Sequence, residues 1–256
     1  MKRSIGLWQF AAVVLLAVLV IEIVLIVVFV VPINWKLGQD YVYYRDVGAR
    51  FVDSGSYYLD RQLHGPYVVA LMVDVLYPPV ALLLFVPFAY LPWFLWWAIP
   101  IAITGYVLWT LRPAPWALCV MLLLMMYPWS IGAYLFGNTE MWVVAVVAAS
   151  IRWGWPSVLL LIKPPFLPLA IIGMRRRSWW IAAAVIGAIS IPMLPLWLDY
   201  VNSTLNMSIR SDYALGGIPL VSVPLVAWIG GPNAPAWVER VAVIVRPRLA
   251  RRPATG

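Results

Sequence analysis

The sequence predicts an all-α protein built as a multi-pass transmembrane helical bundle. Hydrophobic residues make up 64% of the 256 residues and charged residues only 11%, which is too few polar side chains to cover a water-facing surface. Several apolar runs approach or exceed the ~18 residues that a bilayer-spanning helix needs. We expect about eight membrane segments in a single integral membrane domain over residues 1–256, with no separate soluble domain.

Positive charges flank the apolar runs and predict how the chain is oriented. The formal net charge is +8, and the excess lies at Lys2 and Arg3, at 175–177 and in a basic tail at 239–256. This is the positive-inside pattern of membrane proteins, so a nucleic acid partner is not expected. The sequence therefore predicts a cell-membrane protein whose N-terminus and tail are cytoplasmic and whose loop at 33–66 is external.

An external amphipathic helix is expected after the first span. Residues 7–33 form an apolar run that is too long for a signal peptide and that no small-residue cleavage site follows. In the external loop at 33–66, Tyr44, Val47 and Phe51 recur at helical spacing within a charged stretch. We expect a short helix that lies on the membrane surface, with lipid as its partner.

Six further apolar runs predict membrane helices. Proline is tolerated in the first turn of a helix but not inside it, so the paired prolines at 78–79 should begin a helix. A second external loop is expected at 199–214. The predicted spans after the first external loop are 77–90, 93–111, 115–136, 141–151, 179–198 and 215–229.

The stretch at 155–174, WPSVLLLIKPPFLPLAIIGM, is unsuited to a straight lipid-facing helix. Lys163 stands at its middle, where a lysine in lipid costs ~3 kcal/mol or more, and three prolines interrupt it. Arginines flank the stretch on both sides, which predicts that both of its ends are cytoplasmic. We expect a broken or re-entrant pair of half-helices that brings Lys163 into a protein-lined, wet cavity. A lysine that snorkels beside a kink is the alternative.

The chain offers few residues for chemistry. It has no GxxxxGK, HExxH, CxxC or GxSxG motif, and a single histidine and a single cysteine, so we expect neither a metal nor a cofactor. An outward aspartate, an embedded lysine and interfacial arginines remain. These parts suit transfer of a sugar from a lipid phosphate to a hydroxyl, in which a carboxylate takes the acceptor's proton and cations hold the leaving phosphate. Direct displacement would invert the anomeric centre.

Four short motifs occur in an order that resembles the family 87 glycosyltransferases. D-x-x-x-Y at 40–44 is followed by Y-P-P at 77–79, by G-N at 137–138 and by I-K-P at 162–164. Members of this family are multi-pass enzymes of the GT-C superfamily that use polyprenyl-phosphate sugars, typically mannose. The resemblance implies a GT-C-like bundle, a hexosyltransferase activity at the external face and a glycan or glycolipid acceptor.

The resemblance also implies roles for individual residues. Asp40 matches the catalytic base, and Lys163 matches the lysine beside the donor phosphate. Arg45 and Arg210 are further candidates for the phosphate, although Arg45 could instead pair with a neighbouring acid and Asp40 could instead cap its helix. The family usually reads G-Q-x-N where this chain reads G-N-T-E. Further substrate-lining candidates are Tyr44, His64, Tyr77, Asn138 and Glu140.

Two other classes of function fit the same residues. A transporter of lipids or sugar-lipids would also need an embedded lysine and broken helices, but the inverted halves that would favour it are not visible. A non-catalytic subunit would scaffold a membrane partner subunit, and the shortness of the chain for the family favours that reading. Asp40 and Lys163 in one common site would favour the enzyme.

Overall fold

The computed structural model describes residues 36–70, 72–208, 215–232 and 234. Within these residues every regular element is a helix, so the all-α prediction is confirmed. The predicted first span at 7–33, the phosphate candidate Arg210 and the basic tail at 239–256 lie outside the described residues.

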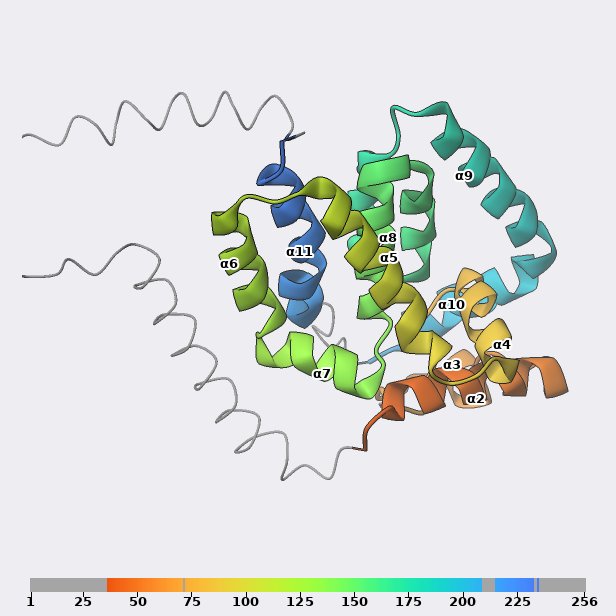
Figure 1. Cartoon of the computed structure of the whole chain (residues 1–256). Helices are drawn as coiled ribbons and strands as arrows, with labels where there is room; N and C mark the ends of the chain where they lie inside the picture. Colours follow the sequence, from red (N-terminus) through yellow and green to blue (C-terminus); the bar gives the residue numbers. More distant parts are fainter. Residues whose placement is uncertain (1–35, 71, 209–214, 233, 235–256) are drawn as a thin grey trace, which may run out of the picture.

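Four helices form the central bundle. The helices α5 (Leu95–Leu111), α8 (Glu140–Trp153) and α11 (Ile218–Ile229) pack against one another, and α6 (Pro115–Met125) packs along α11 (Figure 1). Half of α8 is valine and alanine, and the helix is buried along most of its length. Small and β-branched side chains therefore let the other helices approach α8 closely.

The predicted surface helix exists and lies across one end of this bundle, as Figure 1 shows. It is α2 (Gln39–Ser54), and it is longer than the helical pattern alone indicates. Gly55 ends it in the left-handed conformation, at φ 70°, where its N–H donates to the carbonyl of Phe51. Tyr44 and Val47 are buried, so the apolar face of the helix packs against the protein.

The run at 77–90 forms a short helix that stays at the α2 end of the bundle. It consists of the 3-10 turn η3 (Pro79–Ala81) and of α4 (Leu82–Tyr90), which packs on α2. The helix begins at the paired prolines, as predicted. At the start of the next helix, α5, Trp96 Nε1 donates to the carbonyl of Gly137 at 2.7 Å, beside α2. The chain therefore crosses the bundle in α5 and not in α4.

The run at 115–136 is not one straight helix. Pro128 cannot donate the hydrogen bond that would continue α6, so it begins a new helix, α7 (Pro128–Phe136). The axes of α6 and α7 differ by 67°. The predicted span over these residues is therefore bent at Pro128, and α7 lies beside α2 at one end of the bundle (Figure 1).

The predicted break at Lys163 is confirmed. Two 3-10 helices, η4 (Trp155–Ile162) and η5 (Pro164–Ile172), meet at this residue. The hydroxyl of Ser157 donates to the carbonyl of Ala170 at 2.9 Å, so the two helices lie side by side as a re-entrant pair. Lys163 at the tip is only 5% exposed, so the snorkelling alternative is wrong. The wet cavity around it stays a prediction.

A long apolar helix runs along the outside of the bundle. It comprises α9 (Arg177–Ser190), the turn η6 (Ile191–Met193) and α10 (Leu194–Asn206). Residues 199–206 of the predicted second external loop are helical, and the external position of this loop stays a prediction. Prolines in the first turns of η6 and α10 fit the helix without a lost hydrogen bond.

The predicted number of eight membrane segments is not confirmed. Among the described residues one helix, Arg177–Asn206, is long and apolar enough to cross a membrane, and the bent pair α6 and α7 would make a second. The other apolar helices, which include α5 and α11, are shorter.

Gly48 sets the distance between α2 and α4, and its replacement tests this packing. A Cβ atom at Gly48 would lie 2.5 Å from the carbonyl oxygen of Phe85, which is backbone and cannot turn aside. We expect Gly48→Ala to lower the free energy of unfolding by about 1 to 3 kcal/mol, measured by thermal or denaturant unfolding in detergent. Gly187→Ala in α9 is the control, because nothing lies within 4 Å of its Cβ position. An equally small effect of both changes would contradict the close contact.

Candidate active site

Most of the predicted site residues meet in one buried group at the α2 end of the bundle. We call this group the polar cluster. Its members come from the first two turns of α2, from the loop before η3, from the junction of α7 and α8, and from the tip between η4 and η5. They are Asp40, Tyr44, Tyr77, Asn138, Thr139, Glu140 and Lys163.

Asn138 is the centre of the polar cluster. Its amide Nδ2 donates to Asp40 Oδ2 at 2.6 Å, and its carbonyl oxygen Oδ1 accepts from Lys163 Nζ at 3.3 Å. Lys163 Nζ also donates to Glu140 Oε1 at 3.1 Å, which makes a buried ion pair. One asparagine side chain therefore joins the predicted base to the predicted phosphate-binding lysine.

Two glycines bring Asp40 and Asn138 together. Gly38 is at the N-cap of α2 with φ 72°, and its N–H donates to the carbonyl of Leu135 at 2.9 Å, which fixes the start of α2 on the end of α7. Gly137 ends α7 at φ 74°, a left-handed conformation that glycine adopts without strain. A Cβ atom there would lie 2.7 Å from the ring of Trp97, so the close approach also needs glycine.

Two tyrosines extend the polar cluster through Thr139. The hydroxyl of Tyr77 lies 2.9 Å from that of Tyr44 and 2.9 Å from Thr139 Oγ1. Sequence reasoning proposed both tyrosines but missed Thr139. The only signal was its place between Asn138 and Glu140, and a threonine at a helix start is more often a cap.

Asp40 lies in α2, outside the predicted membrane-spanning segments, and is 4% exposed. Burial raises the pKa of its carboxyl from the usual 3.8 to about 6, while the hydrogen bond from Asn138 and the charge of Lys163 oppose this rise. The charge of Glu140 adds to it. At neutral pH the carboxylate form still prevails, and a base with a pKa near the working pH is well matched to proton transfer.

Glu140 lies against the start of α11. Gly217, at the N-cap of α11, approaches the carboxylate of Glu140 so closely that a Cβ atom would overlap it. The N-terminal end of a helix carries a partial positive charge, which stabilises a carboxylate. Glu140 is thus held by Lys163 on one side and lies beside the start of α11.

Two carboxylate oxygens of the polar cluster remain available. Asp40 Oδ1 and Glu140 Oε2 are both buried and have no hydrogen-bond partner among the described residues. A buried acceptor without a partner costs about 1 to 3 kcal/mol, so such atoms are uncommon in a purely structural network. Each could accept a hydrogen bond from the hydroxyl group of a ligand.

Three predicted site residues are not part of the polar cluster. Arg45 is exposed and pairs with the neighbouring Asp46 at 2.8 Å, as the alternative reading expected, so a role in binding phosphate stays a prediction. His64 is exposed at the end of the short helix α3 (Asp60–Leu63). Arg210 lies outside the described residues. The alternative role of Asp40 as an N-cap is wrong, because Gly38 occupies that position.

Comparison of the chain with protein-family models, with curated proteins and with solved structures finds no match. Within the part of the chain that the structure describes, no group of three His, Cys, Asp or Glu residues could hold a metal ion.

The ion pair of Lys163 and Glu140 is expected to show strong energetic coupling. Lys163→Met would leave Glu140 buried without its cation, and we expect it to lower the free energy of unfolding by about 3 to 5 kcal/mol. The double change Lys163→Met with Glu140→Gln removes both charges and should cost much less than the sum of the two single changes. Chemical unfolding of the four proteins in detergent measures this. Additive single effects would show that the two residues do not interact.

Proposed function

We propose that the chain is a membrane glycosyltransferase of the GT-C type that transfers a sugar, mannose in the first instance, from polyprenyl phosphate to a hydroxyl acceptor. One observation carries the proposal. Asp40 is held through Oδ2 by Asn138, while its Oδ1 is buried and has no partner among the described residues. A carboxylate that is held at one oxygen and has no hydrogen-bond partner at the other could act as a general base once an acceptor hydroxyl reaches it.

The proposed reaction is a single displacement with inversion. Asp40 Oδ1 accepts the proton of the acceptor hydroxyl as its oxygen bonds to the anomeric carbon. The bond between that carbon and the phosphate oxygen breaks at the same time, and polyprenyl phosphate leaves with the electron pair. Phosphate is a good leaving group, so the step needs no second carboxylic acid, unlike the hydrolysis of a glycoside.

Lys163 is the proposed contact to the leaving phosphate. An ammonium group has three donors, and Asn138 and Glu140 accept two of them. The third donor can bind a phosphate oxygen and stabilise the charge that develops on it. Glu140 and Asn138 precede Lys163 in the sequence by 23 and 25 residues. They act as positioning residues, because their hydrogen bonds hold the lysine in place.

The proposed site is at the external face of the membrane. In Figure 1, α2 and α7 lie at one end of the bundle, whereas the turn after α5, the end of α11 and the start of α9 lie at the other. The second end carries Arg112, Arg152 and the arginines at 175–177, which favours the cytoplasm for it by the positive-inside rule. Because α4 stays at the α2 end, the remaining membrane segments cross in alternating directions in this placement. A bundle of about eight membrane segments is then consistent.

Asp40→Asn tests the proposed base. We expect this variant to lose sugar transfer, measured as release of polyprenyl phosphate from labelled polyprenyl-phosphate mannose by the full chain in liposomes with a panel of glycan and glycolipid acceptors. The fold should not suffer. Because the folded-state pKa of Asp40 is raised, its carboxyl destabilises the fold as pH rises from 3.8 through about 6. Above that pH the uncharged variant should be more stable by up to about 3 kcal/mol.

Asp53→Asn is the matched control, because Asp53 is in the same helix and exposed. It should change neither transfer nor stability. Full transfer activity in folded Asp40→Asn would remove Asp40 as the base and with it the proposed function. Lost activity combined with lost stability would instead indicate a structural role for Asp40.

A further inference from the structure

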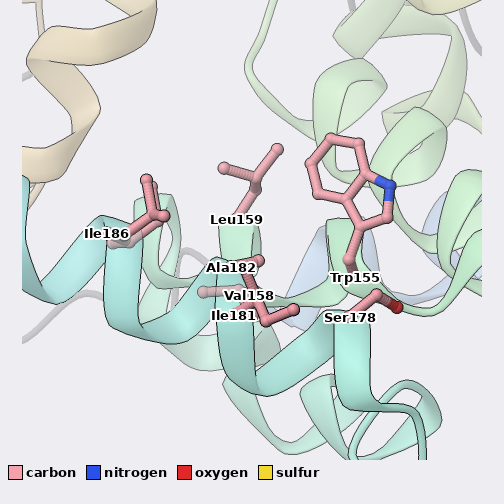
Figure 2. A pocket seen from close by; sticks show the side chains of 8 residues that line it. Trp155, Val158, Leu159, Ser178, Ile181, Ala182 and Ile186 are labelled. Atoms are coloured by element: carbon pink, nitrogen blue, oxygen red, sulfur yellow. The ribbon is translucent and has the colours of Figure 1, made fainter.

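A groove on the outside of the bundle has no role in the proposed reaction. It has a volume of about 330 Å³ and lies between one face of η4 and one face of α9 (Figure 2). Its lining is apolar apart from one serine and the edge of one tryptophan. The lining residues are Trp155, Val158, Leu159, Ser178, Ile181, Ala182, Val185 and Ile186.

The open side of the groove faces the surroundings of the protein and not its core. The α9 helix has no buried residue, and an apolar window of 18 residues within Arg177–Asn206 has none buried inside the protein. In the membrane placement proposed above, such a helix is in contact with lipid. From Ser178 to Ile186 the groove follows α9 for about 12 Å at 1.5 Å per residue, which accommodates part of a hydrocarbon chain.

Four arginines lie next in sequence to the residues at one end of the groove. Figure 2 shows Trp155 and Ser178 at one end and Ile186 at the other. The arginines adjoin the first of these ends in the sequence, and Arg176 Nη1 donates to the carbonyl of Arg152 at 2.7 Å. All four are exposed, and no carboxylate of the described residues lies within 4.0 Å of any of them. We call Arg152, Arg175, Arg176 and Arg177 the arginine group.

We propose that this groove binds an anionic phospholipid, with an acyl chain between η4 and α9 and the phosphate on the arginine group. The charges determine the choice of lipid. Clustered cations without acidic partners attract an anionic headgroup, and the guanidinium fork matches the geometry of phosphate. The adjoining apolar groove ends at Ser178, so the headgroup and the chain of one lipid can be bound together.

The position of the groove separates it from the proposed donor site. The arginine group lies at the end of η4 and α9 that is opposite to α2, as the labelled helices of Figure 1 show. A donor whose phosphate contacts Lys163 must react at the α2 end. The phospholipid is therefore a second ligand, and its binding shares with the proposed function only the placement of the chain in a membrane.

Lipid affinity of the purified full chain tests the proposal without any assay of sugar transfer. The probes are phosphatidylglycerol and phosphatidylcholine with the same acyl chains, added to delipidated protein in detergent and counted by native mass spectrometry. We expect the affinity for phosphatidylglycerol to be at least about tenfold higher than that for phosphatidylcholine, since each arginine near the headgroup strengthens binding severalfold. The double variant Arg175→Gln with Arg177→Gln should lose most of this preference.

Two controls match these changes. Arg112→Gln with Lys36→Gln removes the same charge from exposed sites outside the groove and should leave the preference intact. Ala182→Phe fills the groove and should weaken both lipids at least about fivefold, whereas Ala184→Phe lies on α9 outside the lining and should not.

Three results would overturn the proposal. These are equal binding of the two lipids, an unchanged preference in Arg175→Gln with Arg177→Gln, or an unchanged affinity in Ala182→Phe. Competition of polyprenyl phosphate for the phosphatidylglycerol site would assign the groove to the donor chain and would equally exclude a separate phospholipid site. Loss of sugar transfer in Asp40→Asn bears on none of these outcomes.

Discussion

The structure depends on one constraint, which is that three charged side chains are buried together away from water. Removing a single ion from water costs several kcal/mol, and the fold meets this cost by placing Asp40, Glu140 and Lys163 around the amide of Asn138. The amide donates to Asp40 and accepts from the ammonium of Lys163, which also donates to Glu140, so each of the three groups has a partner. The cost is offset only in part, because two carboxylate oxygens have no partner among the described residues. A ligand with hydroxyl groups could complete the network.

The chain meets this constraint with breaks in its helices. Gly38 and Gly137 turn the backbone sharply on either side of the contact between α2 and α7, and the prolines after Lys163 stop η4 so that the lysine is at a tip. A continuous helix through 155–174 would have no tip at Lys163. The re-entrant pair brings it to Glu140 and Asn138 from inside the bundle. The irregular backbone is therefore concentrated where the polar groups are buried.

Sequence reasoning predicted the parts of this arrangement that depend on local chemistry. Prolines marked the break at Lys163 and the start of the helix formed by η3 and α4, and helical spacing marked α2. The scarcity of acidic residues and the motif order directed attention to Asp40, Lys163 and Asn138. These residues do meet, although they come from elements far apart in the sequence.

The parts that failed depend on packing between elements. Hydropathy alone does not show the 67° bend at Pro128, which needs the missing N–H of proline to be considered, or that α4 remains beside α2, which follows from contacts between the two helices. Sequence reasoning did not foresee that residues 199–206 are helical, because polar residues can also form the last turns of an apolar helix. Thr139 was missed because its role depends on Tyr77, which lies 62 residues away.

An experimental structure of the full chain with a non-reactive polyprenyl-phosphate sugar analogue tests the central claim most directly. The account predicts that the anomeric carbon lies beside Asp40 Oδ1, with space between them for an acceptor hydroxyl, and that a phosphate oxygen contacts Lys163 Nζ. An analogue whose phosphate binds elsewhere, with the polar cluster closed and unchanged, would contradict it.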